Sequence, residues 1–495
     1  MEKKNVVKSC LSLAMVGCMA FATACVGGGD SSLSSDAGNE KVYIEVCDLI
    51  KDKSGVDGLL YNRQQKFAKE YPNIVVTHSE SVVDDSTKTV QQIIEEINSD
   101  DACTLMLTTA ANYARSLYQM GVIEDWKPLL QDSINDLRPE IVEALTSSTG
   151  ALTGFPTTLD TPLIGFNRAH LRSEYVRKAF LGDNYNAANA LDLIEAELDQ
   201  IKTWDEYKAV LAKLTGKYVV DFIETDVSGY GGYYTDFYLG IGVWLIANGY
   251  GISTQNADGT LNVDLNEPTT KEAIEFLQGL SQDGITKIDV GIGFQDFYNK
   301  IFQNQVASFI YYPAWNAWFQ DNAMYADDIK VINIPYGPSV AADIEAGKTV
   351  KTNPSFSNTW VMNKNATDAE KRAAVTYMLY MYSEEAMEEK YEYILENDIE
   401  TFSLPALNID DEYMEDTILE AAPTDWKSSI MVALDNLFVL KPDTDAWRTY
   451  ISSDVPSLLK KDTEYRGDAL ANRLKTLTDR IKTEWLNAYN AEITK

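Results

Sequence analysis

Histidine is scarce in this sequence of 495 residues, in which His78 and His170 are the only two. The sequence therefore has too few histidines to favour catalysis by histidine or a histidine-rich metal site. Basic residues are also few, because 42 Lys and Arg stand against 75 Asp and Glu, for a formal net charge of −33. A surface with this charge repels phosphate backbones, so we expect no nucleic-acid partner.

Long hydrophobic runs are missing as well, since no run reaches the roughly 18 apolar residues expected of a membrane-spanning helix. Near the N-terminus, three lysines precede an apolar run at residues 11–22, and small residues lead to Cys25. This order resembles a bacterial lipoprotein signal peptide with its lipobox, although Ala22 replaces the usual Leu. The resemblance implies cleavage before Cys25, lipidation of Cys25 (palmitate) and anchoring to the outer face of a cell membrane, which suits a Gram-positive cell. An ordinary signal peptide with a chance cysteine is the alternative.

Cysteine is also rare, and such cleavage would leave three of the five cysteines. Cys47 and Cys103 could pair in an oxidising compartment. We expect Cys47 late in one strand and Cys103 early in another. If these strands are parallel neighbours, the two sulfurs lie near opposite ends of the sheet, too far apart to bond. We therefore expect two buried free thiols.

The remaining chain alternates between strand and helix patterns. Residues 26–39 are rich in Gly and Ser and are expected to form a flexible tether, with ordered structure from about Lys41. Strands are expected at residues 42–47, 73–77 and 103–107, and helices at 59–71, 89–97 and 111–120. This alternation predicts an α/β fold with a parallel sheet, in which ligands bind beyond the carboxyl ends of the strands. Thr109 and Asn112 follow the third strand and so lie at a candidate cleft.

Six short motifs follow one another in an order that resembles the maltose-binding-protein-like extracellular solute-binding proteins of family 1. They are Gly154–Asn167, Thr203-Trp204-Asp205-Glu206, Trp244–Gly249, Asn266-Glu267-Pro268, Val306–Trp315 and Asn363-Lys364-Asn365. Each motif alone is weak, and their common order carries the resemblance. The sequence departs from the family pattern at Tyr311-Tyr312, where two glycines are usual, and near Ser357-Asn358, where glycines are missing.

The resemblance implies a two-lobed, periplasmic-binding-protein-like α/β fold of type II, with three hinge crossings near Pro156, Gln303 and Pro354. The expected division is a signal peptide at 1–24, a tether at 25–40, a first lobe at 41–156 and 304–353, and a second lobe at 157–303 and 354–495. A ligand that touches both lobes stabilises the closed form only as far as it binds this form better than the open one.

Sugars present hydroxyl edges, which suit carboxylates, and apolar faces, which suit aromatic rings. The ligand-binding candidates are Asp160, Trp315, Tyr312, Tyr230, Tyr233, Tyr234, Trp447, Trp360, Thr109 and Asn112. Asp160 and Trp315 match family positions that contact sugar. The three tyrosines at 230–234 are expected to lie in a glycine-rich loop, and we expect one of them to face the ligand. A turn acid, or an aromatic core residue, is the plain alternative for each candidate.

Binding without turnover is what the resemblance implies, so we expect no catalytic residue, no cofactor and no metal. Asp258 lies in a turn that faintly resembles part of a calcium loop, and a hairpin is expected there instead. We expect a monomer that hands a carbohydrate, an oligosaccharide, to the permease subunits of an ABC importer. The alternatives are the same fold with a peptide, polyol or sugar acid, a glycoside hydrolase built on paired acids, and a structural surface lipoprotein.

Overall fold

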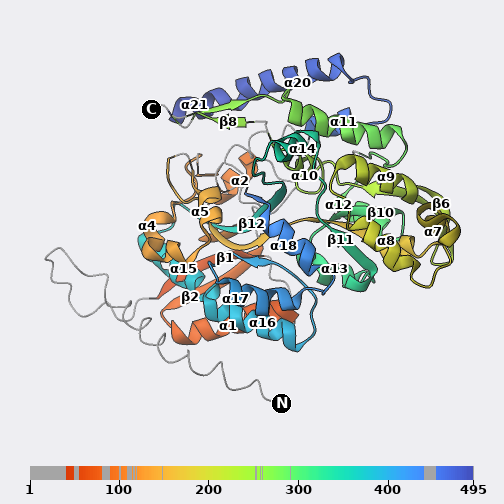
Figure 1. The fold of residues 1–495 in the computed structure, drawn as a ribbon. Coiled ribbons are helices and arrows are strands. Elements are labelled where there is room, and N and C mark those ends of the chain that lie inside the picture. The colour runs from red at the N-terminus through yellow and green to blue at the C-terminus, as the bar shows by residue number, and fades with distance from the viewer. Residues whose placement is uncertain are drawn as a thin grey trace, which may run out of the picture. The chain divides into compact units, whose positions relative to one another are not determined.

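A computed structural model describes residues 41–493 apart from 49–54, 81–89, 100–101, 109–113, 115–116, 119, 148, 251–252, 257, 259, 290 and 440–452. Figure 1 shows the arrangement of the helices and strands. The expected signal peptide and tether lie outside the described residues, as do Cys25, Thr109, Asn112 and Trp447.

The first sheet has seven strands among the described residues, in the order β13-β4-β12-β3-β1-β2, with β14 paired to β12. They are β1 (Val42–Asp48), β2 (Ile74–Glu80), β3 (Leu105–Thr108), β4 (Phe155–Asp160), β12 (Asn353–Met362), β13 (Leu404–Pro405) and β14 (Leu437–Val439). β1 pairs in parallel with both β2 and β3, which confirms the parallel arrangement expected of the three N-terminal strands. β12 runs antiparallel to its neighbours β3 and β4.

The second sheet has the order β11-β5-β10-β7-β6. Its strands are β5 (Leu163–Asn167), β6 (Gly216–Val220), β7 (Ile223–Gly231), β10 (Val306–Tyr311) and β11 (Ile329–Ile332). β10 is parallel to β7 and antiparallel to β5. Every residue of β5, β10 and β11 is buried, because helices pack against these strands and leave neither face to solvent.

A separate hairpin joins β8 (Ser253–Gln255) to β9 (Leu261–Val263) in antiparallel pairing. The carboxylate of Asp258 accepts hydrogen bonds from the backbone N–H of Thr260 at 3.0 Å and from its hydroxyl at 2.6 Å. These bonds close the turn from within, so the expected hairpin at Asp258 is confirmed.

Helices fill the connections between the strands. They are α1 (Gly55–Glu70), α2 (Val90–Ile97), α4 (Lys127–Leu130), α5 (Pro139–Leu145), α6 (Arg168–Leu171), α7 (Glu174–Leu181), α8 (Ala190–Leu198), α9 (Trp204–Leu214), α10 (Ile241–Ala247), α11 (Pro268–Gln282), α12 (Phe294–Phe302), α13 (Asn316–Asp321), α14 (Pro338–Glu345), α15 (Asp368–Met381), α16 (Glu384–Glu396), α17 (Asp411–Tyr413), α18 (Lys427–Asp435), α20 (Asp468–Ile481) and α21 (Asn487–Ile493). α1 packs against α15 and α16 beside the first sheet (Figure 1), while α9 and α12 pack on β10 of the second.

The Thr-Trp-Asp-Glu motif begins α9 with a capping box. The backbone N–H of Thr203 donates to the Glu206 carboxylate at 2.9 Å, and the N–H of Glu206 donates to Thr203 Oγ1 at 3.4 Å. The two side chains thereby satisfy N–H groups that the first helical turn leaves without partners. The buried Trp204 donates from its ring nitrogen to the carbonyl of Pro335 at 2.9 Å, which fixes the start of the helix to the rest of the protein.

The chain passes from the first sheet to the second between β4 and β5, through Thr161 and Pro162 alone. It returns to the first sheet as β12. The buried amide of Asn353 ties these two crossings together, because its Nδ2 donates to Thr161 Oγ1 and, at 3.1 Å, to the carbonyl of Pro162. Thr161 Oγ1 donates in turn to the carbonyl of Pro354 at 3.4 Å. Side chains therefore hold the two crossing segments together.

Strand pairing divides two segments differently from the expected lobes. β10 and β11, from the segment 304–353, belong to the second sheet, and β12, most of which lies in 354–495, belongs to the first. The chain therefore returns to the first sheet at β12 and not near Gln303, because β10 pairs with β5 and β7. The boundaries of the lobes as moving bodies stay a prediction.

Cys47 and Cys103 form a disulfide, so the expectation of two free thiols is wrong. β1 and β3 are parallel neighbours as expected, with Val46 opposite Leu105. Cys103 precedes β3, however, so strand pairing does not fix its position opposite the first residues of β1. It can therefore approach Cys47 near the other end of that strand. Its Cα lies 5.9 Å from that of Cys47, a separation typical of disulfides. The hydroxyl of Ser79 lies 3.2 Å from each sulfur.

None of the helices described here combines the length and the apolar character that crossing a membrane requires. Within the described ranges, no group of three or more His, Cys, Asp or Glu is placed to hold a metal ion. His170 is buried, its Nδ1 lies 3.1 Å from the hydroxyl of Tyr218, and burial lowers its pKa to about 3. His170 is therefore a neutral residue of the core.

Candidate functional site

Asp160 is the last residue of β4, and only 7% of its surface is exposed. β4 pairs with β13 so that Leu159 is opposite Leu404. This register brings Ser403 beside Asp160, and Ser403 Oγ donates a hydrogen bond of 2.7 Å to the carboxylate. Burial raises the pKa of Asp160, and the bond from Ser403 and the positive charge of Lys390 act in the opposite direction.

Two side chains of α16 complete the surroundings of Asp160. Tyr391 is buried, and its hydroxyl donates to the backbone carbonyl of Ser403 at 2.6 Å. Lys390 is half-buried; burial lowers the pKa of its ammonium group, and the charge of Asp160 opposes this effect. Asp160, Ser403 and Lys390 thus place an acid, a hydroxyl and a base together, and such a set can exchange hydrogen bonds with the hydroxyl groups of a ligand.

Trp315 follows β10 in a short 3-10 turn and is half-buried. Its ring centre lies 4.8 Å from that of Tyr312, whose hydroxyl donates to the carbonyl of Tyr238 at 2.9 Å. Tyr312 is fully buried, and burial raises its pKa, with further contributions from the negative charges of Asp236 and Asp160. The charge of Asp160, on the first sheet, therefore acts on a phenol at the end of a strand of the second sheet.

Trp315 belongs to an aromatic cluster that also contains Phe294, Tyr298 and Trp318. The ring centre of Trp315 lies 6.2, 6.0 and 6.2 Å from those of the other three, at steep angles between the ring planes. Phe294 is 40% exposed, and Trp315 and Trp318 are half-buried. Ring surface open to solvent, near a buried carboxylate, is the combination that sugar recognition uses.

Of the three candidate tyrosines at 230–234, two are fully buried and Tyr233 is half-buried. Tyr230 accepts a hydrogen bond of 3.1 Å from the ring nitrogen of Trp244. The hydroxyl of Tyr234 lies 3.1 Å from that of Thr286. In this structure Tyr233 is thus the one member of the three with surface for a ligand.

The glycines around these tyrosines serve close packing. Gly229 and Gly231 lie within β7, where a loop was expected. A Cβ atom on Gly229 would collide with the carbonyl oxygen of Leu211 in α9, and one on Gly231 would lie 2.7 Å from Val306 in β10. Glycine therefore lets a helix and a strand approach β7 closely, and this end of β7 belongs to the core.

A cavity of about 350 Å³ on the side of the first sheet is lined by Ser403, the hydrogen-bond partner of Asp160. α1, α16, β4, β12 and residues 403–407 contribute its walls, and Ser403, Lys390 and Tyr391 are among its lining residues. The candidate Trp360 lines this cavity as well. Trp360 is buried, and its ring nitrogen donates to the hydroxyl of Tyr382 at 3.1 Å. Trp360 is therefore separate from the aromatic cluster.

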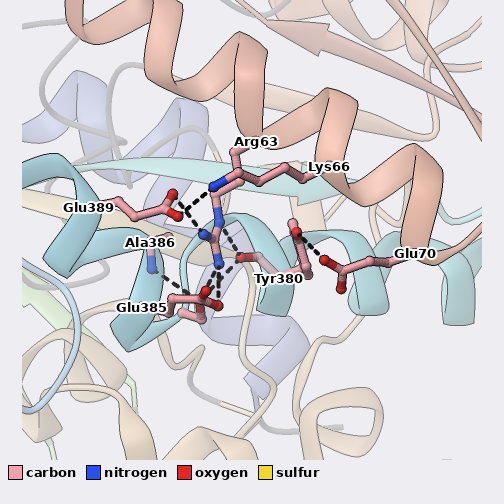
Figure 2. Close-up of polar contacts among 8 residues, drawn as sticks. Arg63, Lys66, Glu70, Tyr380, Glu385, Ala386 and Glu389 are labelled. Atoms are coloured by element: carbon pink, nitrogen blue, oxygen red, sulfur yellow. Dashed lines mark hydrogen bonds and ion pairs between the residues drawn. The ribbon is translucent and has the colours of Figure 1, made fainter.

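Arg63 of α1 forms part of the cavity wall and joins α1 to α15 and α16 (Figure 2). Its guanidinium donates to the carbonyl of Tyr380 at 3.0 Å, to Ser383 Oγ at 2.8 Å and to the Glu389 carboxylate at 3.1 Å. The ring of Tyr380 lies beneath it, with the guanidinium carbon 4.6 Å from the ring centre. Only 4% of the Arg63 side chain is exposed, so its charge is balanced within the protein.

Ser403, Lys390 and Tyr391 were not among the candidates from the sequence. Lys390 is the one basic residue in the acidic helix 384–396, and this contrast is a signal that the sequence offers. Ser403 offers no such signal, because its position beside Asp160 depends on strand pairing across 243 positions of the chain. Thr109, Asn112 and Trp447 lie outside the described residues, so their contact with ligand stays a prediction.

The sequence model of one protein family matches residues 62–396, which is more than half of the chain, and the family is described as bacterial extracellular solute-binding protein. The matched range contains Asp160, Trp315 and Lys390. No curated protein matches the sequence.

Several solved structures resemble this one. The ABC substrate-binding protein Lmo0181 of Listeria monocytogenes, in complex with cycloalternan, has a TM-score of 0.62 at 17% identity, over 90% of this chain and 99% of its own. The maltose/maltodextrin-binding domain MalE of Bdellovibrio bacteriovorus, bound to maltotriose, has a TM-score of 0.60 at 17% identity, over 90% and 100%. A sugar transporter protein of Arthrobacter chlorophenolicus with bound laminaribiose has a TM-score of 0.59 at 16% identity, over 90% and 99%. At these identities the likeness concerns the fold, and it confirms the expected mixed α/β fold of two-lobed binding proteins.

Proposed function

Because the chain belongs to the bacterial extracellular solute-binding proteins, we propose that it captures a carbohydrate, an oligosaccharide, and delivers it to an ABC importer. The observation that carries the proposal is that Tyr312 is linked to both the buried acid Asp160 and the half-buried ring of Trp315: its ring centre lies 4.8 Å from that of Trp315, and the charge of Asp160 helps to raise its pKa. A carboxylate accepts hydrogen bonds from sugar hydroxyls, and an aromatic ring covers the apolar face of a sugar. The structural relatives add support, since their ligands are cycloalternan, maltotriose and laminaribiose.

Each side chain has a role in this capture. Asp160 in its ionised form accepts hydrogen bonds from sugar hydroxyls, and Ser403 holds the carboxylate in place. Trp315 offers a ring face, and Tyr233 offers a second one from the end of β7. Thr109, Asn112 and Trp447 stay in the proposal as further contacts, on the strength of the family resemblance.

Closure of the two lobes is the proposed mechanism of capture. A ligand held by Asp160 on the first sheet and by Trp315 on the second gains contacts in the closed form that the open form lacks. This difference in binding free energy is what shifts the equilibrium toward the closed form. A closed, loaded receptor is the form that we propose docks on the importer.

The ligand leaves unchanged in this proposal. The family and the structural relatives are binding proteins, and binding requires no paired acid and base at a scissile bond. The acid Asp160 and the ring of Trp315 favour a sugar as the solute. No comparable observation favours a peptide, a polyol or a sugar acid.

Anchoring at Cys25 completes the proposal. The apolar run at 11–22 would direct export, and acyl chains on Cys25 would tether the mature protein, a monomer, to the outer face of the cell membrane. Replacement of Cys25 by Ser should release the protein from the membrane fraction into the medium, and an unchanged membrane fraction would contradict the anchor. Labelling with a palmitate analogue tests the same residue directly.

Thermal unfolding with a panel of sugars tests the central proposal. Maltose, maltotriose, cellobiose and laminaribiose are each added to the purified protein. A ligand at about 100 times its Kd adds about 2.7 kcal/mol to the stability of the native state and raises the midpoint by a few degrees. The shift should disappear in Trp315→Ala and Asp160→Asn. No shift with any of these sugars or with their glycosides would refute capture of this class of ligand.

A further inference from the structure

The cavity beside Asp160 has walls of two kinds. Ser403, which bonds to Asp160, and Lys390, whose charge acts on Asp160, are among its polar lining residues. Much of the remaining wall is apolar, with Leu59, Leu60 and Met387 as examples. A ligand that fills this space must therefore combine a polar part near Ser403 with an apolar part against the leucine and methionine side chains.

The charges around the cavity do not favour a second charged ligand group. Arg63 is engaged by Glu389 at 3.1 Å and by Glu385 at 3.4 Å, and Figure 2 shows both carboxylates directed at its guanidinium. Lys390 shares its surroundings with the charge of Asp160. Because each cation has an acid near it, an uncharged group is the better match.

A sugar ring is a poor match for the apolar walls, because its hydroxyl groups would lose water and find no partners among Leu and Met side chains. An aromatic ring or a short acyl chain suits them, since burial of its surface is favourable in itself. The volume of about 350 Å³ falls in the range of small-molecule sites, about 300 to 1,000 Å³.

We infer that this cavity receives an apolar group, aryl or short acyl, that is attached to the sugar bound at Asp160. The inference rests on the proposed function and makes it more specific, because the ligand class becomes a substituted glycoside and not a bare oligosaccharide. The sugar lies at Asp160 and Trp315, and its substituent passes Ser403 into the cavity.

Matched pairs of ligands test this inference by titration calorimetry on the purified protein. Each sugar of the panel (maltose, maltotriose, cellobiose and laminaribiose) is compared with its own 4-nitrophenyl glycoside. We expect the nitrophenyl form of any sugar that binds to have a Kd at least about tenfold lower, because the ring is buried among apolar side chains. Its heat-capacity change on binding should also be more negative.

A variant that fills the cavity distinguishes the contribution of the substituent to the affinity from that of the sugar. Ala386 lines the cavity at the first turn of α16 and is labelled in Figure 2. Ala386→Phe should abolish the advantage of the nitrophenyl form and leave the Kd of the free sugar within about twofold. The matched control Ala342→Phe makes the same change at an exposed position of α14 and should leave both affinities as they are. Leu59→Asn, which places a polar group in the wall, should reduce the advantage and guards against misfolding of the Phe variant.

Three results would overturn the inference, and they differ in whether they also refute the proposed function. Equal affinity for a sugar and its nitrophenyl glycoside would refute binding of a substituent in the cavity and would leave the proposed carbohydrate capture intact. A nitrophenyl advantage that survives both Ala386→Phe and Leu59→Asn would place the substituent elsewhere. No binding of any free or substituted sugar would refute the proposed function and this inference with it.

Discussion

The hydroxyl of Ser403 donates a 2.7 Å hydrogen bond to the carboxylate of Asp160, although the two residues are 243 positions apart in the chain. The bond links the strand that leads out of the first sheet to the segment that follows α16. Tyr391 fixes the same segment through the backbone carbonyl of Ser403 at 2.6 Å. The orientation of the acid in the proposed sugar site therefore depends on residues far along the sequence.

Replacement of Ser403 by Ala removes this donor from a buried carboxylate. We expect sugar affinity to fall about tenfold and the free energy of unfolding to fall by about 1.5–3 kcal/mol, since hydrogen bonds to charged groups are worth about this much. Calorimetry and urea unfolding measure the two effects. The control is Ser457→Ala, which removes an exposed hydroxyl and should change stability by less than about 0.5 kcal/mol. Equal effects of the two variants would contradict a special role for Ser403.

The raised pKa of Asp160 makes stability depend on pH. Above the unfolded value of about 3.9 the unfolded chain loses its proton first, so the native state holds more protons and loses stability as the pH rises through its own pKa. Asp160→Asn cannot titrate and still accepts the bond from Ser403. The ligand-free variant should therefore gain stability relative to the parent as the pH rises from about 4, with no difference in slope below about pH 3. Urea unfolding from pH 3 to pH 8 measures this, and a difference that does not change with pH would contradict it.

The disulfide between Cys47 and Cys103 closes a loop with a sequence separation of 56. By the loop-entropy relation its removal costs about 4 kcal/mol, with a range of about 2–5 kcal/mol. Reduction, or the double variant Cys47→Ala/Cys103→Ala, should lower Tm accordingly. Alkylation followed by mass spectrometry of the unreduced protein should find neither thiol labelled, and two labelled thiols would contradict the disulfide.

The buried side chain of Arg63 contributes more to the free energy of unfolding than the exposed side chain of Lys66 beside it. Arg63→Ala removes donors to Tyr380, Ser383 and Glu389 from a side chain that is 4% exposed. We expect a loss of about 2–4 kcal/mol in the free energy of unfolding. Lys66→Ala, whose side chain is 53% exposed and binds the same Glu389, should cost less than about 1 kcal/mol. Arg63→Lys should recover only part of the loss, because an ammonium group cannot reach three acceptors in fixed directions.

The backbone of the turn between β6 and β7 is strained at Phe222, and burial of the Phe222 side chain does not offset this strain. Phe222 has a φ of +69° and its side chain is fully exposed. Phe222→Gly should therefore raise stability by about 1 kcal/mol, because glycine adopts this conformation without steric cost. Phe222→Ala keeps a Cβ atom and should gain little. Denaturant unfolding compares the two variants, and equal stabilities would show that strain at this position is small.

Much of the first sheet could be predicted from the sequence. The alternation of strands and helices before residue 108 predicted a parallel sheet, and β1 does pair in parallel with β2 and β3. The start of α9 was visible as a capping box, because its two members are three residues apart and their bonds are local.

What the sequence left open depends on contacts between distant segments. Ser403 reaches Asp160 through the pairing of β13 with β4, and no local pattern contains that register. The glycines at 229 and 231 looked like a loop, while their reason is the approach of α9 and β10 to β7. The place of β10 in the second sheet was open for the same reason, since a buried strand of apolar residues fits either sheet until its neighbours are known.

The amide of Asn353 bonds to both residues of the link between β4 and β5 while its own backbone continues into β12. The link between β4 and β5 and the start of β12 are therefore bonded to each other, so the proposed closure, as a rotation of one sheet relative to the other, has to bend both together. Ligands of different length would stop this rotation at different angles. The receptor would thus convert the length of a sugar chain into an angle, and an importer that reads the distance between the two lobes could tell ligands apart without touching them.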